Sequence, residues 1–417
     1  MVYVVSQEGK PLMPTKRHGK VKHLLRSGMA KVVCREPFTI QLNYTSSEYT
    51  QQITLGVDAG SKTIGLSAST ETEELYAAEV LLRTDVVDLL SARRAFRRAR
   101  RSRTTRYRAP RFDNRKKLDD WLAPSIRQKI QTHHKAVALV YKILPVSKIV
   151  VEVAAFDIQK IRNPEVSGVG YQQGEQADFW NVREYVLWRD NHTCQHCKGK
   201  CRDKILNVHH IESRTIGGDA PNNLITLCET CHKKHHAGEI VLKAKRGISF
   251  RDAAFMGIMR WSFFNKIKEQ YSNVNLTYGY LTKMTRIAHG LTKGHCTDAF
   301  CIAKNMDATM LSTSNRYLQK AVRRHNRQIH KATIAKCGKR QLNQAPKVIH
   351  GFKLFDKVSY RKQNCFVFGR RSSGYFDLRR LDGTKIHASA NVREIKRVVS
   401  AKTFLTEALG GSASSPA

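Results

Sequence analysis

The sequence predicts a mixed α/β protein of several domains, and three observations support this prediction. Short apolar runs typical of strands alternate with amphipathic stretches typical of helices over most of the 417 residues. A group of cysteines and histidines lies at 194–236, between two such regions. Residues 93–117 carry 13 Lys or Arg and one acidic residue, Asp113. The length fits roughly two to four domains of ~150 residues each.

The charge balance indicates an extensive polyanionic partner. The chain has 73 Lys plus Arg against 34 Asp plus Glu, a net charge of +39. Self-repulsion on this scale opposes folding unless a polyanion neutralises it, and the basic residues run through the chain rather than forming one tail. The opening MVYVVSQEGK lacks the features of a signal peptide, and no apolar run is long enough for a membrane span. We therefore expect a cytoplasmic protein (prokaryotic cytosol or nucleoid) without a membrane partner.

The expected elements follow from the apolar runs and the turn residues between them. They are a small β-containing module with a helix at 19–28, a β-hairpin at 52–70, the basic stretch, an amphipathic helix at 124–143, a buried strand at 148–156, a turn-rich linker at 158–178, the cysteine and histidine cluster, a strand at 273–280, a helix at 295–312, and the short strands of a small barrel at 350–398.

Three acidic residues and one histidine form the first candidate site. Asp58 ends an apolar strand, and Glu152 is the one acidic residue inside the apolar run KIVVEVAAF. His295 and Asp298 share one face of a predicted helix. Each has a plainer explanation: a turn cap for Asp58, an ion pair with an arginine for Glu152, and a helix cap for the helical pair. Three converging carboxylates repel unless divalent cations lie between them, and two Mg²⁺ ions about 4 Å apart are usual for phosphodiester cleavage.

A second candidate site combines two pairs of cysteines with several histidines. Cys194, Cys197, Cys228 and Cys231 form two C-x-x-C pairs, which predict a structural Zn²⁺ site, and Cys201 is a possible substitute ligand. A zinc ribbon without chemistry is the plainer explanation. Against it stand His209 and His210 on an apolar run, then Asn223, and then His232 and His236 four residues apart on a predicted helix.

This second cluster resembles the metal site of the HNH nucleases. The resemblance implies that His210 is the general base that activates water and that Asn223 orients it. It further implies that His209 and His232 hold a single Mg²⁺, with His236 matching a third ligand seen in some members.

The ordered whole resembles IscB, a family of transposon-encoded RNA-guided nucleases related to the ancestors of CRISPR effectors. The matching segments are PLMP at 11–14, LGVDAGSKTIGL, VVEVAAF and HCTDAFCIA for three RuvC motifs, the Arg-rich stretch for a bridge helix, and FVFGRRSSGYFDLRRLDGTKI for a C-terminal domain. The resemblance implies an RNase H-like (RuvC) core split in three, with an inserted zinc-containing ββα-metal HNH domain. Asp58, Glu152, His295 and Asp298 would form the RuvC site, where the three carboxylates would hold two Mg²⁺ ions.

The resemblance also implies a domain order. This order is the PLMP domain at 1–52, RuvC part I at 53–82, the bridge helix at 83–117, RuvC part II at 118–158, a linker at 159–178, the HNH domain at 179–245, a linker with RuvC part III at 246–320, a basic segment with the target-adjacent-motif-interacting domain, small and β-barrel-like, at 321–409, and a disordered tail at 410–417.

The implied function is RNA-guided cleavage of both strands of double-stranded DNA by a monomeric protein bound to a large guide RNA. The HNH site would cut the guide-paired strand and the RuvC site the displaced strand, beside a short flanking motif. The bridge arginines would bind nucleic acid; they are Arg93, Arg94, Arg97, Arg98, Arg100, Arg101, Arg103, Arg106 and Arg108. A disordered basic arm is the plainer explanation of this stretch, although Phe96, Tyr107 and Phe112 favour an ordered, docked element.

Three other functions remain open from the sequence. The first is an endonuclease of the same chemistry that reads DNA without a guide. The second is an actin-like ATPase built on DAGSKTIG, whose only candidate for a second phosphate loop is LDGTKI at 381–386. The third is a non-enzymatic RNA-binding protein with a zinc ribbon, which would leave His210, Glu152 and Asp298 unexplained.

Overall fold

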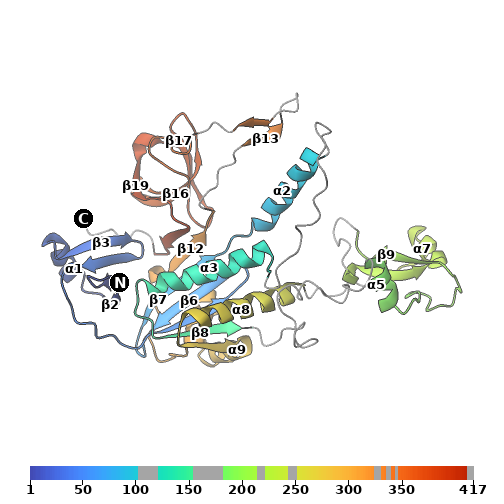
Figure 1. The fold of residues 1–417 in the computed structure, drawn as a ribbon, viewed down its shortest axis with the longest axis horizontal. Helices are drawn as coiled ribbons and strands as arrows, with labels where there is room; N and C mark the ends of the chain where they lie inside the picture. Colours follow the sequence, from blue (N-terminus) through green and yellow to red (C-terminus); the bar gives the residue numbers. More distant parts are fainter. Residues whose placement is uncertain are drawn as a thin grey trace. The chain divides into compact units, whose positions relative to one another are not determined.

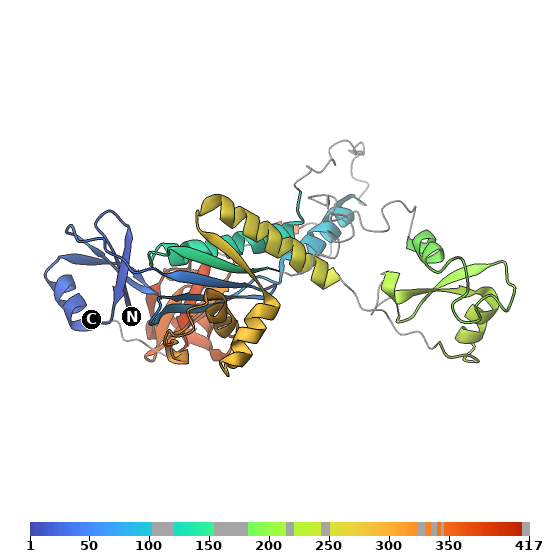
Figure 2. The ribbon, with the colours of Figure 1, turned by 90° about the horizontal axis from the view of Figure 1, so that it is seen from below.

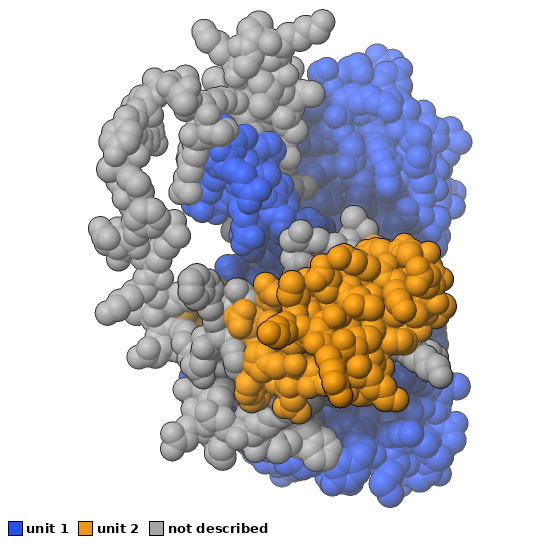
Figure 3. Space-filling model, turned by 90° about the vertical axis from the view of Figure 1, so that its right-hand side faces the viewer, with its two compact units in different colours: residues 1–107, 124–155, 259–417 blue, residues 108–123, 156–258 orange. Residues whose placement is uncertain are grey.

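The computed structural model describes residues 1–101, 121–153, 182–213, 221–242, 251–323, 330–334, 340–342 and 346–410. The expected linker at 158–178 and residues 411–417 of the expected tail lie outside this set. The chain divides into two units, of which the first comprises residues 1–107, 124–155 and 259–417 and the second 108–123 and 156–258 (Figure 3).

The first unit begins with a small sheet and one helix, as the sequence predicts. The strands pair in the order β2-β1-β4-β3. The elements are β1 (Val2–Val5), β2 (Pro11–Thr15), α1 (His18–Arg26), β3 (Ala30–Arg35) and β4 (Phe38–Leu42). Val21 of α1 is buried against Val2, Val4 and Ile40 of the sheet, so the helix covers its apolar face.

A seven-stranded sheet in the order β11-β8-β5-β6-β7-β12-β20 forms the centre of the first unit. Its strands are β5 (Thr54–Ala59), β6 (Thr63–Ser69), β7 (Glu74–Leu81), β8 (Lys148–Val153), β11 (Val274–Tyr278), β12 (Tyr317–Ala321) and β20 (Phe404–Ala408). The antiparallel pairing of β5 with β6 confirms the predicted hairpin. On the other side of β5, β8 and then β11 add in parallel. Two segments far apart in the sequence therefore extend the sheet beyond β5, with β8 as the direct neighbour of β5.

Helices cover both faces of this sheet. Figure 2 shows α3 (Pro124–Tyr141) and α8 (Arg251–Gln270) along one face, with α9 (Gly279–Ala288) and α10 (His295–Ala303) on the other. The predicted helix at 124–143 is thus confirmed. The helix predicted at 295–312 is real but ends early, because Lys304 adopts the left-handed conformation at φ 65°.

Two glycines allow α10 to lie close against the sheet. A Cβ atom at Gly56 of β5 would lie 2.0 Å from the carbonyl oxygen of Ala299. A Cβ atom at Gly65 of β6 would lie 2.0 Å from the carbonyl oxygen of His295. Any other residue at either position would clash with the helix backbone. The two glycines therefore fix how closely α10 approaches β5 and β6.

The Arg-rich stretch begins as a helix, α2 (Val86–Arg101), seen in Figure 1 as the cyan helix. Every residue from Val87 to Ala99 is exposed. The prediction of an ordered element is confirmed up to Arg101, whereas its docking stays a prediction. Tyr107 and Phe112 lie outside the described residues.

The remainder of the first unit is mostly β-structure. A five-stranded sheet in the order β18-β17-β16-β15-β19 confirms the run of short strands predicted at 350–398. Val358, Val367, Phe376 and Leu378 form its fully buried core. The strands and turns are η3 (Thr313–Asn315), β13 (His330–Ile334), β14 (Arg340–Leu342), β15 (Lys357–Tyr360), β16 (Gln363–Arg370), β17 (Tyr375–Arg379), β18 (Lys385–Asn391), η4 (Val392–Glu394) and β19 (Ile395–Val399).

The second unit contains a two-stranded antiparallel sheet flanked by two helices. Its elements are α5 (Val182–Arg189), β9 (Leu206–His210), η2 (Pro221–Asn223), β10 (Leu224–Cys228) and α7 (Glu229–His236). Ile225 and Leu227 of β10 pack with cysteines in its core. In neither unit do the described residues include a helix long and apolar enough to cross a membrane.

Candidate functional sites

Asp58 and Glu152 lie on neighbouring strands and point to the same face of the central sheet. The parallel register of β5 and β8 places Gly56 beside Val150. Because side chains alternate along a strand, Asp58 and Glu152, each two residues further, face the side that α10 covers. Both carboxylates are buried, with residue exposures of 6% and 8%.

The first turn of α10 brings His295 and Asp298 to this face. The imidazole Nδ1 of His295 lies 2.7 Å from Oδ2 of Asp58, and this hydrogen bond raises the pKa of His295. Asp298 forms an ion pair with Arg286 of α9, whose Nε lies 3.0 Å from Oδ1 without the alignment of a hydrogen bond. The four residues predicted from three separate segments therefore gather at one end of the sheet.

Arg260 of α8 is a fifth member of this site, which the sequence reasoning missed. Its Nη1 lies 3.1 Å from Oε1 of Glu152 and its Nη2 lies 3.9 Å from Oδ1 of Asp58. Its Nε donates a hydrogen bond to the carbonyl of Ala59 at 2.8 Å. Glu152 thus does have the arginine partner that the plainer explanation expected. The signal was present: Arg260 is the one charged residue in the apolar run AAFMGIMRWSFF.

The three carboxylates concentrate negative charge in a poorly solvated place. Burial raises the pKa of Glu152, the guanidinium of Arg260 opposes this rise, and the charges of Asp58 and Asp298 add to it. Burial and Asp58 likewise raise the pKa of Asp298. Such a donor set of carboxylate oxygens suits hard divalent cations. Among the described residues, the carboxylate oxygens of Asp58, Glu152 and Asp298 do not all lie within 4.8 Å of one another. They are therefore further apart than the ligands of the cysteine and histidine clusters.

Four cysteines of the second unit form a cluster that fits zinc. The sulfur atoms of Cys194, Cys197, Cys228 and Cys231 all lie within 4.8 Å of one another. Cys197 and Cys228 are 3.8 Å apart, which is about the edge of a tetrahedron with Zn–S bonds of ~2.3 Å. Cys201 lies 3.9 Å from Cys231 but is exposed and outside the group of four.

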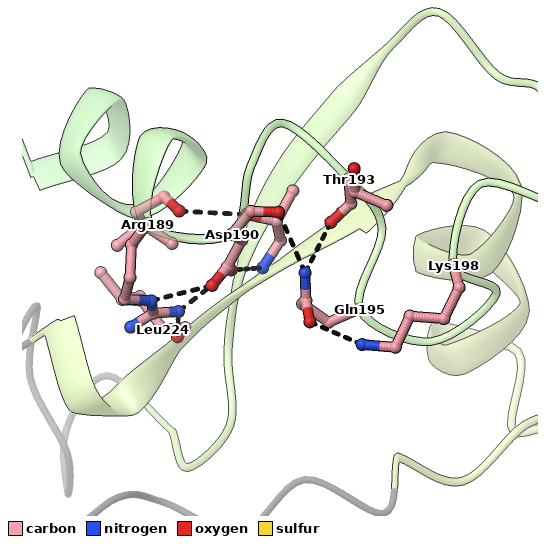
Figure 4. A network of polar contacts seen from close by, with 8 residues as sticks. Arg189, Asp190, Thr193, Gln195, Lys198 and Leu224 are labelled. Carbon is pink, nitrogen blue, oxygen red and sulfur yellow. Dashed lines mark hydrogen bonds and ion pairs between the residues drawn. The ribbon is translucent and has the colours of Figure 1, made fainter.

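A polar network supports the loop that carries the first cysteine pair (Figure 4). Asp190 accepts two hydrogen bonds from Arg189, at 2.8 and 3.0 Å, and one from the backbone N–H of Thr226 at 2.9 Å. Burial disfavours the charge of Asp190, but these hydrogen bonds outweigh it and lower the pKa. Gln195 donates to the carbonyls of Asp190 and Thr193. The network ties the end of α5 and the cysteine loop to β10.

Histidines of β9 and α7 form a second cluster in this unit. Ligand atoms of His209, His232 and His236 lie within 4.8 Å of one another. The ring of His235 is also close, with its centroid 4.8 Å from that of His209. Burial and the neighbouring histidines lower the pKa of His209 to about 4. Its imidazole is therefore neutral near pH 7 and offers a lone pair to a cation, which fits the divalent metal expected here.

His210 and Asn223 lie beside this cluster. Because side chains alternate along β9, His209 and His210 leave the strand on opposite faces, so His209 can bind a metal while His210 stays outside that ligand group. The side chain of Asn223 is fully buried and forms two hydrogen bonds with the backbone of Glu212. It accepts the N–H of Glu212 at 2.9 Å and donates to its carbonyl at 3.0 Å. Asn223 thereby fixes the chain just after His210.

Six of the arginines expected to bind nucleic acid belong to α2. Arg93, Arg94, Arg97 and Arg98 are exposed on α2. Arg100 and Arg101 end that helix, and their side chains are not among those described. Arg103, Arg106 and Arg108 lie outside the described residues.

Comparison with known proteins assigns part of the chain. Residues 194–238 match the HNH endonuclease family, so the chain contains an HNH endonuclease domain. Residues 2–174 match the RRXRR protein family, and residues 97–101 read RRARR. No curated protein matches.

Solved structures show a distant likeness. Streptococcus thermophilus Cas9 in complex with the GGAA PAM matches with a TM-score of 0.30 and 15% identity, over 52% of this chain and 31% of that chain. The same protein with the AGAA PAM matches with a TM-score of 0.29 and 11% identity, over 61% and 32%. The chain thus spans less than a third of those proteins.

Proposed function

We propose that this protein is an IscB-like RNA-guided DNA endonuclease with two nuclease sites. It binds a large guide RNA, recognises a short motif beside its target and hydrolyses both DNA strands. The HNH site of the second unit cuts the guide-paired strand, and the carboxylate site of the first unit, a RuvC site on an RNase H-like sheet, cuts the displaced strand. The domain order follows the one expected from the sequence.

One observation carries this proposal. The segment that matches HNH endonucleases, 194–238, interrupts the chain between Glu152 of β8 and Asp298 of α10. Nevertheless β8 and α10 both lie beside Asp58 on β5. The acidic site is thus assembled from segments on both sides of the HNH segment. An enzyme that needs only its HNH site, or a non-enzymatic zinc ribbon, gives no reason for such a second site.

At the carboxylate site, Asp58, Glu152 and Asp298 would hold two Mg²⁺ ions. Bound there, divalent cations supply activation of water and stabilisation of the leaving oxygen. The hydrogen bond between His295 and Asp58 orients that carboxylate. The tight approach of α10 at Gly65 fixes His295 itself.

At the HNH site, His209 and His232, with His236 as a third candidate, would hold a single Mg²⁺ that stabilises developing charge. His210 takes the proton of the attacking water as general base. Asn223 positions the chain that follows His210. The four-cysteine cluster holds zinc and keeps β10 and α7 together, since Cys228 and Cys231 begin that helix.

Guide RNA is supported by the exposed arginines of α2 and by the net charge of +39. Arginine grips phosphate oxygens in pairs through its planar fork. Fewer than 40 residues separate Asp113 from Glu152, too few for a large protein lobe to enclose a guide. Base pairing would then read the sequence, and the protein would read only the flanking motif.

The decisive experiment is to recover the RNA that purifies with the full chain and to reprogram its guide segment. We expect a discrete RNA, and cleavage of plasmid DNA that follows the new guide. Cleavage of fixed sites by RNase-treated protein would instead identify a guide-independent endonuclease.

A further inference from the structure

We propose that Arg260 is an internal counter-cation that a divalent metal ion must displace from Asp58 and Glu152. The inference rests on the proposed carboxylate site and concerns a residue that neither family match assigns. Arg260 would occupy the site between reactions and set the metal concentration at which the site is loaded.

The contacts of Arg260 show that it lies where a cation would bind. Its guanidinium reaches one oxygen of Glu152 at 3.1 Å and one of Asp58 at 3.9 Å. The hydrogen bond of Nε to Ala59 aims the guanidinium at this pair. The Arg260 side chain is only 17% exposed, so the ion pairs are weakly screened by solvent.

Arg260 and a metal ion cannot share these oxygens easily. Mg²⁺ binds carboxylate oxygens at ~2.0–2.1 Å in a strict octahedral geometry. An ion at that distance would lie within a few ångström of the guanidinium nitrogens, where like charges repel strongly in a poorly solvated site. Loading the site therefore requires Arg260 to move away.

A second acceptor for the displaced arginine lies on the helix that packs against α8. The fully buried His133 of α3 bonds through Nδ1 to the carbonyl of Lys129 at 2.8 Å, so its Nε2 is an acceptor. This Nε2 has no hydrogen-bond partner within the described ranges. The His133 ring contacts Phe263, one turn from Arg260 on α8, at 5.0 Å between ring centroids. Burial, and to a lesser degree the positive charge of Arg260, lowers the pKa of His133.

The test is a titration of the RNA-free full chain with Mn²⁺. The electron paramagnetic resonance signal of free Mn²⁺ measures how much of the ion is bound. A His209→Ala background removes the HNH metal site, and Asp58→Asn in that background defines the signal of the carboxylate site. Arg260→Gln should bind Mn²⁺ at least tenfold more tightly, and Arg260→Lys, which keeps the charge, should stay within about threefold of the parent. Arg83→Gln is the matched control, because Arg83 is 16% exposed and pairs with Asp85 instead.

Equal or weaker Mn²⁺ binding by Arg260→Gln would overturn the inference and leave Arg260 as a structural ion pair. Asp58→Asn is tested in the His209→Ala background with and without Arg260→Gln. If it removes no Mn²⁺ binding in either case, the carboxylate site itself is wrong, and the proposed function falls with it. A measurement on the parent chain covers the case in which Arg260→Gln does not fold. The Nε–H resonance of Arg260, assigned with Arg260→Lys, should lose its protection from exchange when Mg²⁺ saturates the site. Unchanged protection would contradict displacement.

Discussion

At the scale of single residues, His133 links the stability of the first unit to pH. Burial is the main cause that lowers the pKa of His133, to about 4. In the unfolded chain a histidine titrates near pH 6.5. Between these values the unfolded state binds more protons, so the free energy of unfolding is fully maintained above pH 6.5 and falls as the pH falls toward 4.

We therefore predict that His133→Leu flattens the acid side of the stability curve. The parent should lose on the order of 3 kcal/mol more than the variant between pH 6.5 and 4, from a shift of about 2.5 pKa units. Urea unfolding at several pH values measures this difference. The exposed His18→Leu serves as control and should follow the parent curve. Parallel curves for His133→Leu and the parent would refute the buried, neutral state of His133.

Also at this scale, the sequence reveals charged residues that stand alone in apolar runs. Glu152 was found in this way, and Arg260 could have been found by the same rule. What the sequence could not supply is their pairing, because Glu152 and Arg260 are more than 100 residues apart and the pairing depends on how α8 lies over the sheet. The arrangement of Asn223 with Glu212 was hidden for a similar reason, since it depends on the antiparallel pairing of β9 with β10.

At the scale of elements, the contact of α10 with the sheet depends on the absence of side chains. Gly65→Ala would place a Cβ 2.0 Å from the carbonyl oxygen of His295, so the helix must shift. Such overpacking typically costs ~1–3 kcal/mol. We predict this loss in urea unfolding, together with loss of displaced-strand cleavage and retention of paired-strand cleavage.

Gly19→Ala in α1 is the control for this substitution. A Cβ at Gly19 meets no atom within 4 Å. Alanine there should leave stability unchanged or raise it by up to ~1 kcal/mol, because alanine favours helices over glycine. If Gly65→Ala and Gly19→Ala behaved alike, the close approach of α10 would not be a constraint on the fold.

The exposed arginines of α2 lead to a separate prediction about RNA binding. Each arginine that contacts a phosphate makes the slope of log K against log salt steeper by roughly 0.7–0.9. Replacing Arg93, Arg94, Arg97 and Arg98 by glutamine should therefore reduce the slope of guide RNA binding by about 3. Filter binding of guide RNA across a salt series measures the slope.

The control for α2 removes the same charge elsewhere. Four exposed basic residues of the N-terminal module are replaced by glutamine: Lys20, Lys22, Arg26 and Lys31. This variant should change the slope by clearly less than the α2 variant. Equal changes would mean that net charge, and not contact along α2, sets the affinity for RNA.

At the scale of the whole molecule, the predicted order of elements agrees with the fold while some boundaries do not. Periodicity placed the hairpin at β5 and β6, the buried strand β8 and the helix α3. It extended α10 too far, because the helix ends at Lys304 in the left-handed conformation, and a lysine does not mark a helix end in the sequence as a glycine would. The seven-stranded order could not be predicted, since β20 joins the central sheet from the far end of the chain. Such pairing depends on contacts distant in sequence.

The central claim is that one chain carries two independent nuclease sites, one in each unit. Asp58 and Glu152 belong to the first unit, and His210 belongs to the second. Loss of either site should leave the other active, because they share no residue.

Cleavage of a guide-matched duplex labelled separately on each strand tests this claim most directly. The account predicts that His210→Ala cuts only the displaced strand, and that Asp58→Ala or Glu152→Ala cuts only the guide-paired strand. Target binding should be unchanged in all three variants. Loss of both cuts in Asp58→Ala, with binding intact, would contradict the account.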